Sequence, residues 1–328
     1  MSKARAPLSS VVVVGAGQVG ILAAIAVKRA VPGCDVLVVA QQGDARDFAD
    51  NAASTLPFAN RLFERLGIDE AAIIARAGGS HRLIERYFGW GGESQHGALS
   101  YGDMPAQGAV GFGREWGGGS RSAADEREPG SLAEVLADAG RFRVAQPGET
   151  GALAKVDFAP RWNPTAFRQM LIQYAQQLGI AYRQAPLTRV GLAEAGDIAE
   201  IELASSEILT ADLYLDCSGV SRQLVSHFPG AELVSWTKSG GAQSVIIAAP
   251  GQPMVALEDR LSLTPHGWLR EFAGRDGLQQ VAGIPAHLAQ EQACAALGLQ
   301  PVAQIPCRQA ALVQCWIGNT IAIGDAAA

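Results

Sequence analysis

Basic residues are in short supply: no block of lysine and arginine stands out, and the formal net charge is −6 at pH 7. Because proteins that bind nucleic acids usually carry a basic patch or stripe, this charge pattern argues against a nucleic-acid partner. Charged residues make up 18% of the chain and hydrophobic residues 48%, a composition that excludes a disordered protein. The 38 glycines follow no three-residue period, so a collagen-like protein is excluded as well.

Cysteine and histidine are also sparse. The five cysteines form no Cys-x-x-Cys pair and one is left over, which is typical of a reduced, cytoplasmic protein. Cys217 follows Asp216 on an expected buried strand, so we interpret it as a structural thiol. The five histidines lack metal spacing such as His-Glu-x-x-His, and no Gly-x-Ser-x-Gly motif occurs. No metal site and no serine hydrolase are expected.

One long hydrophobic run, at residues 11–27, is preceded by Lys3 and Arg5 and has the look of a secretory signal or a membrane segment. Three glycines interrupt this run, and Lys28 and Arg29 close it. A strand, a tight turn and a helix explain the same residues better. We therefore expect no membrane segment.

The start of the chain has the pattern of a dinucleotide-binding unit. Four valines at 11–14 are typical of a doubly buried parallel strand, GAGQVG follows at once, 21–30 reads as a helix, and 35–40 reads as a second strand. The first glycine permits the turn, the second lets the backbone approach a pyrophosphate, and the third lets helix pack on strand. The helix N-terminus offers free N–H groups to the phosphates. The predicted cofactor contacts are Gly15, Ala16, Gly17, Val19 and Gly20.

The ribose end of this fingerprint departs from the usual pattern. An acidic residue about 20 positions after the last glycine normally holds the ribose hydroxyls. Here Ala40, Gln41 and Gln42 stand in that region. The Gln41 amide can bind a hydroxyl without charge assistance, so a weaker ribose contact is predicted at Gln41. The alternative to a dinucleotide site is a glycine-rich turn that binds no ligand.

The remaining elements follow from periodicity and turn residues. Helices are expected at 59–66, 70–77 and 163–178. Strands are expected at 181–183, 189–193, 198–204, 207–210, 213–219, 245–249, 268–272 and 278–281, with the third and fourth of these forming a hairpin. Residues 81–88 suit either a strand or a helix, and the glycine- and serine-rich stretch 89–130 is expected to be a loop.

Three segments in this order carry a family resemblance: VVVVGAGQVG at 11–20, ADLYLDCSGVSRQL at 211–224 and CWIGNTIAIGDAAA at 315–328. Together they resemble the flavin-dependent tryptophan halogenase family, which is related in fold to single-component flavin hydroxylases. The resemblance covers essentially the whole chain. It implies an α/β protein with a Rossmann-like FAD-binding fold, a parallel sheet, and an interleaved, mostly antiparallel sheet on the substrate side.

The resemblance also implies a cofactor, partners and a division of the chain. FAD would be bound by 1–45, 155–230 and 310–328, and the substrate side would be formed by 46–154 and 231–309. A small aromatic substrate and a separate flavin reductase would be the partners. Gly324 and Asp325 would lie beside the glycine turn, near the flavin ribityl chain, at the end of a strand adjacent to the first one. The alternative for Asp325 is a helix N-cap.

Arg82 marks the main departure from the family. Eight residues before Trp90, it occupies the position of the family's catalytic lysine, and it is the candidate catalytic residue. A guanidinium stays protonated and is a poor nucleophile, although it can hold an anion or hydrogen-bond an oxidant. The alternative is a solvated or ion-paired arginine on the surface.

Other family motifs are altered too. Ala53 replaces the acid of a Gly-Glu-Ala-Thr-x-Pro segment. A Trp-x-Trp-x-Ile-Pro segment would begin at Trp268, but Arg270 and Ala273 replace its second tryptophan and its proline. The family's catalytic glutamate would follow the last residue, Ala328, so we expect the chain to be truncated or partial.

The resemblance implies a FAD-dependent oxidoreductase that acts with reduced flavin and oxygen on an indole-like ring. The substitution at Arg82 predicts weak or absent halogenation of tryptophan. The alternatives are a flavin monooxygenase that hydroxylates its substrate, and a flavin-binding protein without catalytic activity.

Overall fold

The chain divides into two compact units. The computed structural model describes residues 7–41, 43, 46–92, 96–102, 131–236, 242–307 and 309–328. Unit 1 comprises 1–52, 164–240 and 305–328, and unit 2 comprises 53–163 and 241–304. Each unit is therefore assembled from separate stretches of sequence, and unit 2 is contributed by two insertions into unit 1.

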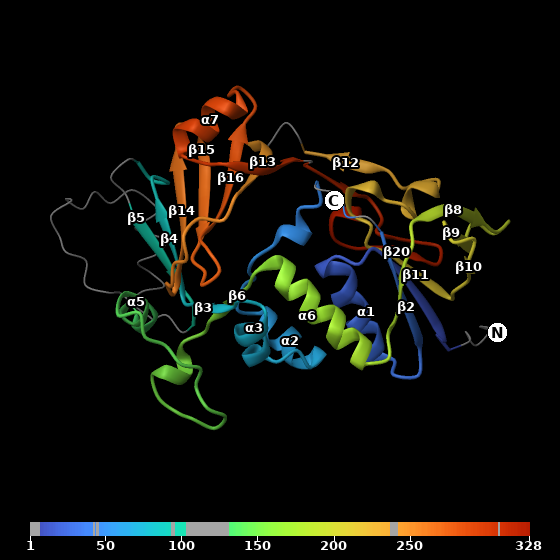
Figure 1. The fold of residues 1–328 in the computed structure, drawn as a ribbon, viewed down its shortest axis with the longest axis horizontal. Helices are drawn as coiled ribbons and strands as arrows, with labels where there is room; N and C mark the ends of the chain where they lie inside the picture. Colours follow the sequence, from blue (N-terminus) through green and yellow to red (C-terminus); the bar gives the residue numbers. More distant parts are fainter. Residues whose placement is uncertain are drawn as a thin grey trace. The chain divides into compact units, whose positions relative to one another are not determined.

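A six-stranded sheet forms the centre of unit 1 (Figure 1). Its order is β19 (Trp316–Ile317), β20 (Thr320–Ala322), β11 (Leu213–Asp216), β1 (Ser10–Val14), β2 (Asp35–Ala40) and β7 (Ala181–Gln184). All neighbouring strands run parallel except β19 and β20. The four valines of β1 are fully buried, as the apolar run predicts for the middle of a parallel sheet.

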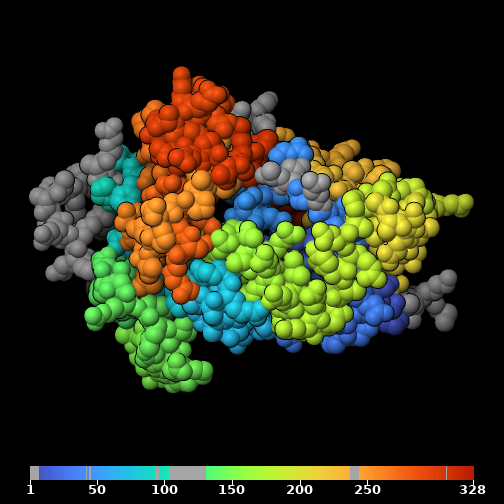
Figure 2. Space-filling model, in the orientation of Figure 1, coloured from blue at the N-terminus to red at the C-terminus, as the bar shows by residue number. Residues whose placement is uncertain are grey.

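Two helices pack together beside this sheet. The predicted strand–helix–strand unit is confirmed, although helix α1 (Gln18–Ala30) begins three residues before the expected start, so that Gly20 lies in its first turn. Helix α6 (Pro164–Gln177) packs against α1 and buries Phe167 and Leu171. The solvent-facing side of α6 is visible in light green in Figure 2.

Smaller elements complete unit 1. The predicted hairpin is present in a three-stranded antiparallel sheet of β8 (Leu187–Leu192), β9 (Ile198–Leu203) and β10 (Ile208–Leu209), with Ser206 at a φ of 62° in its turn. Strands β12 (Leu233–Ser235) and β18 (Ala310–Leu312) form a separate pair. Short 3₁₀ turns lie at Ala49–Asn51, Gly219–Ser221, Val225–His227 and Gly324–Ala326.

Unit 2 is built on a seven-stranded sheet (Figure 1). Its order is β17 (Pro301–Pro306), β13 (Ala242–Ala248), β16 (Gln279–Pro285), β15 (Gly267–Phe272), β14 (Glu258–Thr264), β4 (Ile84–Phe88) and β5 (His96–Ser100). Only β4 and β14 pair in parallel among the pairings described, so the predicted mostly antiparallel sheet is confirmed. Helix α7 (Gln290–Leu297) packs Ala293 and Cys294 against Ile246 and Ile284 of this sheet.

The rest of unit 2 is helical or forms a short strand pair. The helices are α2 (Ala59–Leu66), α3 (Glu70–Arg76), α5 (Leu132–Asp138) and a 3₁₀ turn at Leu153–Lys155, and the strands are β3 (Ser80–Arg82) and β6 (Ala159–Arg161). Residues 81–88 are thus extended. The expected loop at 89–130 is wrong for His96–Ser100, because these residues pair with β4 as strand β5; residues 93–95 and 103–130 lie outside the described part.

The hydrophobic run near the start of the chain is accounted for by β1 and the first part of α1. In the part of the chain that the structure describes, no helix has both the length and the apolar character needed to cross a bilayer.

Candidate functional site

The glycine turn between β1 and α1 has a conformation that only glycine tolerates. Gly15 has a φ of +111°, and its amide donates a hydrogen bond of 2.9 Å to the carbonyl of Val39. A Cβ on Gly15 would overlap the carbonyl oxygen of Cys217, and a Cβ on Gly20 would overlap the carbonyl oxygen of Gly15. The turn therefore lies pressed between β2 and the end of β11, at the carboxyl edge of the parallel strands.

Gly324 lies beside this turn, as the sequence predicts. A Cβ on Gly324 would lie 3.1 Å from Cγ1 of Val19. The expectation that the strand before Gly324 neighbours β1 is wrong, because β11 is inserted between β1 and β20. The N-cap alternative for Asp325 is also wrong: Asp325 lies inside its 3₁₀ turn, and its carboxylate accepts a hydrogen bond of 2.8 Å from the amide of Ala49.

Ala49 is part of a segment, residues 46–52, that crosses the carboxyl edge of the sheet. Asp47 Oδ1 accepts a hydrogen bond of 2.9 Å from the amide of Val220, and Asp50 Oδ1 accepts one of 2.8 Å from the amide of Gln18. The Gln18 side chain donates to the carbonyls of Asp50 and Ala52, at 2.7 and 3.1 Å. The 46–52 segment is thereby fixed to the first turn of α1 and to the turn after β11.

Asp50 and Arg168 are functional candidates that the sequence analysis missed. They line a pocket of about 280 Å³ together with Pro164, Thr165, Gln169 and Ile172. Arg168 Nε donates a hydrogen bond of 2.6 Å to the carbonyl of Ala16 in the glycine turn. Burial raises the pKa of Asp50, although the amide of Gln18 and the charge of Arg168 act to lower it. No local motif marks either residue, because their proximity arises from tertiary packing.

Gln41 lies after β2 as expected, and its side-chain amide is engaged with the backbone. Its Oε1 accepts a hydrogen bond of 3.0 Å from the amide of Leu187, and its Nε2 donates at 3.4 Å to the carbonyl of Ala185. Contact with a ribose through Gln41 would require these bonds to be exchanged.

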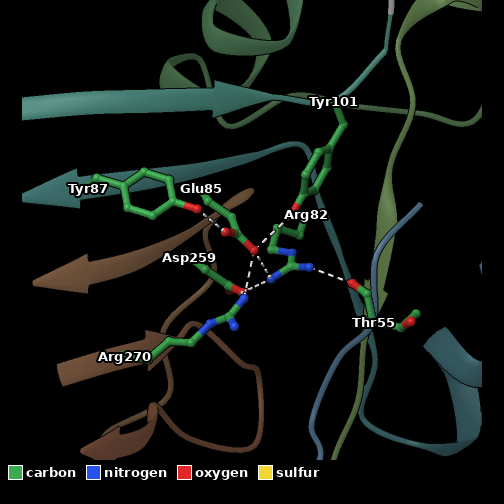
Figure 3. A network of polar contacts seen from close by, with 7 residues as sticks. All are labelled: Thr55, Arg82, Glu85, Tyr87, Tyr101, Asp259 and Arg270. Carbon is green, nitrogen blue, oxygen red and sulfur yellow. Dashed lines mark hydrogen bonds and ion pairs between the residues drawn. The ribbon is translucent and has the colours of Figure 1, made fainter. Parts of the chain in front are cut away.

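Arg82 lies in unit 2, in a cluster of buried charges (Figure 3). The guanidinium forms ion pairs with Asp259 and with Glu85, the latter at 3.1 Å, and donates a hydrogen bond to the carbonyl of Thr55. Only 2% of Arg82 is exposed. The surface-arginine alternative is wrong about exposure and right about ion pairing: β4 and β14 cover the side chain and supply its carboxylates.

Three further side chains complete this charge cluster of Arg82, Glu85, Tyr87, Tyr101, Asp259 and Arg270. Arg270 Nη2 lies 2.6 Å from Oε1 of Glu85 and 3.6 Å from Oδ2 of Asp259. The hydroxyls of Tyr87 and Tyr101 donate to Glu85 at 2.7 and 3.0 Å, and Figure 3 shows both pointing at that carboxylate. The cluster pairs the two arginines that replace family positions with two carboxylates.

The pKa values of the cluster follow from its contacts. Burial acts to raise the pKa of Glu85, but Arg270, the Tyr87 hydroxyl and Arg82 outweigh it, so this pKa lies below its ordinary value. Burial and the hydrogen bond to Glu85 raise the pKa of Tyr87 to about 12. Glu85 is therefore an anion at neutral pH, and both tyrosines remain protonated donors.

This shift predicts a pH dependence of stability. Because the pKa of Glu85 is lowered on folding, its contribution is fully present above its ordinary value of 4.5 and is lost as the pH falls through the lower pKa of the folded state. We expect the difference in unfolding free energy between the wild type and Glu85→Gln to be constant from pH 7 to 5 and to shrink below pH 4.5. Urea unfolding at several pH values measures it; a difference that grows on acidification would contradict the assignment.

The other positions of the altered motifs pack within the protein. Trp268 pairs with Gly283 across β15 and β16, and a Cβ on Gly283 would overlap the indole ring. Ala53 and Ala273 are buried.

Burial raises the pKa of the Cys217 thiol far above its ordinary value, which suits an inert cysteine. Within the described residues, no group of three or more histidines, cysteines and carboxylates is arranged to hold a metal ion.

Known proteins resemble this chain in sequence and in fold. The sequence model of the tryptophan halogenase family matches residues 10–328. Among solved structures, BrvH, a flavin-dependent halogenase from Brevundimonas sp. BAL3, is 23% identical with a TM-score of 0.80, over 98% of this chain and 67% of that one. The flavin-dependent halogenase Xcc4156 from Xanthomonas campestris is 20% identical, with a TM-score of 0.79 over 98% and 66% of the two chains.

A third similar structure is SttH, a tryptophan 6-halogenase from Streptomyces toxytricini, with 19% identity and a TM-score of 0.81 over 98% of this chain and 68% of that one. The chain thus spans about two thirds of the length of these enzymes. No curated protein sequence matches it.

Proposed function

Because the chain belongs to the tryptophan halogenase family, we propose that it is a FAD-dependent oxidoreductase that uses reduced flavin and oxygen on a small aromatic, indole-like substrate. The observation that carries this proposal is the glycine turn at the carboxyl edge of the parallel sheet, with Gly324 and Asp325 beside it. A separate flavin reductase would supply reduced flavin.

The residues of this edge fit an anionic dinucleotide. Gly17 leaves no Cβ between the backbone and a ligand, whereas Gly15 and Gly20 let the turn pack closely on Cys217 and on itself. The first turn of α1 already binds a carboxylate through the amide of Gln18. We assign contacts with the pyrophosphate to Gly15, Ala16, Gly17, Val19 and Gly20, and contacts near the ribityl chain to Gly324 and Asp325. Arg168, held to the carbonyl of Ala16, would neutralise phosphate charge.

Bound FAD supplies the redox chemistry with oxygen, and the protein supplies binding, orientation and electrostatics. In unit 2, Arg82 is committed to Asp259, Glu85 and the Thr55 carbonyl. Its guanidinium stays protonated, so it offers no nucleophile to carry an oxidised halide. We therefore assign Arg82 a positioning role within the charge cluster, in place of the chemistry of the family's lysine.

This commitment of Arg82 favours a second candidate, hydroxylation of the aromatic ring by a flavin monooxygenase. A protein that binds flavin without turnover is the third. The three differ in what they produce: a halogenated ring, an oxygenated ring, or no product from protein that still retains flavin.

The test uses the full chain with FAD, a flavin reductase, NADH, oxygen and tryptophan or indole. We expect the protein to retain flavin absorbance after removal of free FAD, and mass spectrometry to detect little or no brominated product when bromide is added. Mixtures without the protein control for peroxide made by free reduced flavin. An oxygenated product independent of bromide would support hydroxylation; robust bromination with Arg82 intact would contradict the role assigned to Arg82, and absence of bound flavin would contradict the proposed function.

A further inference from the structure

The phosphate-binding face of the glycine turn already holds an anion that belongs to the protein. A Cβ on Gly17 would overlap both carboxylate oxygens of Asp50, so this carboxylate lies directly on the glycine. Asp50 Oδ1 accepts the amide of Gln18, the first residue of α1, at 2.8 Å. Free amides at a helix N-terminus are the groups that bind phosphate in dinucleotide sites, so Asp50 occupies the position that a pyrophosphate oxygen would take.

The position of Asp50 is fixed on both sides along the chain. On one side, the amide of Ala49 is held by Asp325, and Asp47 is bound by the amide of Val220. On the other, the Gln18 side chain holds the carbonyl of Ala52. The carboxylate is therefore presented to the turn by a segment with several anchors, all within unit 1.

The surroundings of Asp50 offer it a place to move to. The pocket of about 280 Å³ that it lines with Arg168 opens beside the turn. Arg168 contributes positive charge on one side of this pocket while remaining bonded to the Ala16 carbonyl. A carboxylate that leaves the amide of Gln18 would therefore enter a pocket whose lining includes the positive charge of Arg168.

We propose that Asp50 is an internal competitor for the phosphates of the dinucleotide, and that the cofactor binds at the turn only when this carboxylate gives up the amide of Gln18. This inference rests on the proposed function, because it presumes that FAD is the ligand of the turn. Two anions cannot share one set of N–H donors, so the affinity for FAD is reduced by the stability of the contact between Asp50 and the turn.

Removal of the carboxylate has two effects of opposite sign. Asp50→Ala frees the amide of Gln18 for the phosphates. Because a hydrogen bond to a charged group contributes about 1.5–3 kcal/mol, FAD is expected to bind on the order of tenfold or more tightly. The same variant loses a bond that fixes the 46–52 segment, so the cofactor-free protein is expected to unfold at a lower temperature. A purely structural role of Asp50 would weaken both folding and binding.

The experiment titrates the full chain with FAD, followed by quenching of flavin fluorescence, and measures the unfolding temperature without FAD. Asp50→Asn is the second variant, and it serves if Asp50→Ala folds poorly. It keeps the shape of the side chain and loses its charge, so its affinity for FAD is expected to lie between those of the wild type and Asp50→Ala. Asp35→Ala is the matched control, since Asp35 is an exposed carboxylate at the start of β2, the end of this strand away from the glycine turn. It is expected to leave the affinity unchanged.

The outcomes separate the two proposals. Tighter binding of FAD by both Asp50 variants than by the wild type supports the competitor role. Equal or weaker binding by the Asp50 variants, with measurable binding by the wild type, overturns it and leaves the proposed function standing. Failure of the wild type and of every variant to bind FAD overturns the proposed function and this inference together.

Discussion

Asp259→Ala is expected to lower the free energy of unfolding by about 3–5 kcal/mol, the usual cost of leaving a buried charge without its partner. Asp259 and Arg82 are 3% and 2% exposed, and their ion pair joins strands β14 and β3 within unit 2. Without Asp259, the carboxylate that still pairs with Arg82 is Glu85, and it is shared with Arg270 and two tyrosine hydroxyls. Urea unfolding of the variant and the wild type at pH 7 measures the loss.

The control for this variant is Asp138→Ala. Asp138 pairs with Arg86, but its side chain is 56% exposed, so the expected loss is below about 1 kcal/mol. The double variant Arg82→Met with Asp259→Leu removes both buried charges at once and is expected to recover a large part of the stability. Equal effects of Asp259→Ala and Asp138→Ala would show that the buried pair has no special weight.

Gly15→Ala is expected to destabilise unit 1 by about 2–6 kcal/mol, because backbone strain and overpacking each cost on the order of 1–3 kcal/mol. The strain arises from the φ of +111°, and the overpacking from the carbonyl of Cys217, which is backbone and cannot turn aside. Relief of both costs requires the turn to move away from the end of β11. We therefore expect FAD binding to be lost together with stability, as measured by flavin titration and urea unfolding.

Gly33→Ala is the matched control for Gly15→Ala. Nothing lies within 4 Å of a Cβ placed on Gly33, so this substitution is expected to change stability by less than about 1 kcal/mol. Normal stability and FAD affinity in Gly15→Ala would show that the turn tolerates a side chain, which would contradict the close approach between β1 and β11.

The strand–helix–strand unit was predictable because its signals are local. Four consecutive valines, the spacing of three glycines and a second apolar strand lie within one short stretch of sequence. Strand β5 was missed for the opposite reason: its glycine- and serine-rich surroundings read as a loop, and pairing with β4 makes it a strand. The position of Gly324 was foreseen through the family resemblance, while the insertion of β11 beside β1 was not.

The charge cluster could not be predicted from sequence, because Arg82 and Asp259 are 177 residues apart. Their contact depends on the register between β4 and β14, which no turn connects directly. The position of Arg82 relative to Trp90 identifies it as a candidate, but this spacing carries no information on its burial or its partners. The contact of Asp50 with Gly17 has the same origin: it follows from the path of the 46–52 segment across the sheet, which local composition does not encode.

The strand order of unit 1 also sets the sequence in which the protein is able to assemble during translation. β11 forms its parallel ladder with β20, so residues 320–322 must have left the ribosome before that edge of the sheet is covered. All the residues of unit 2 have been synthesised by position 304. The residues of the inserted unit thus leave the ribosome before those of β20, so this unit is free to fold while β11 of its host still has an unpaired edge.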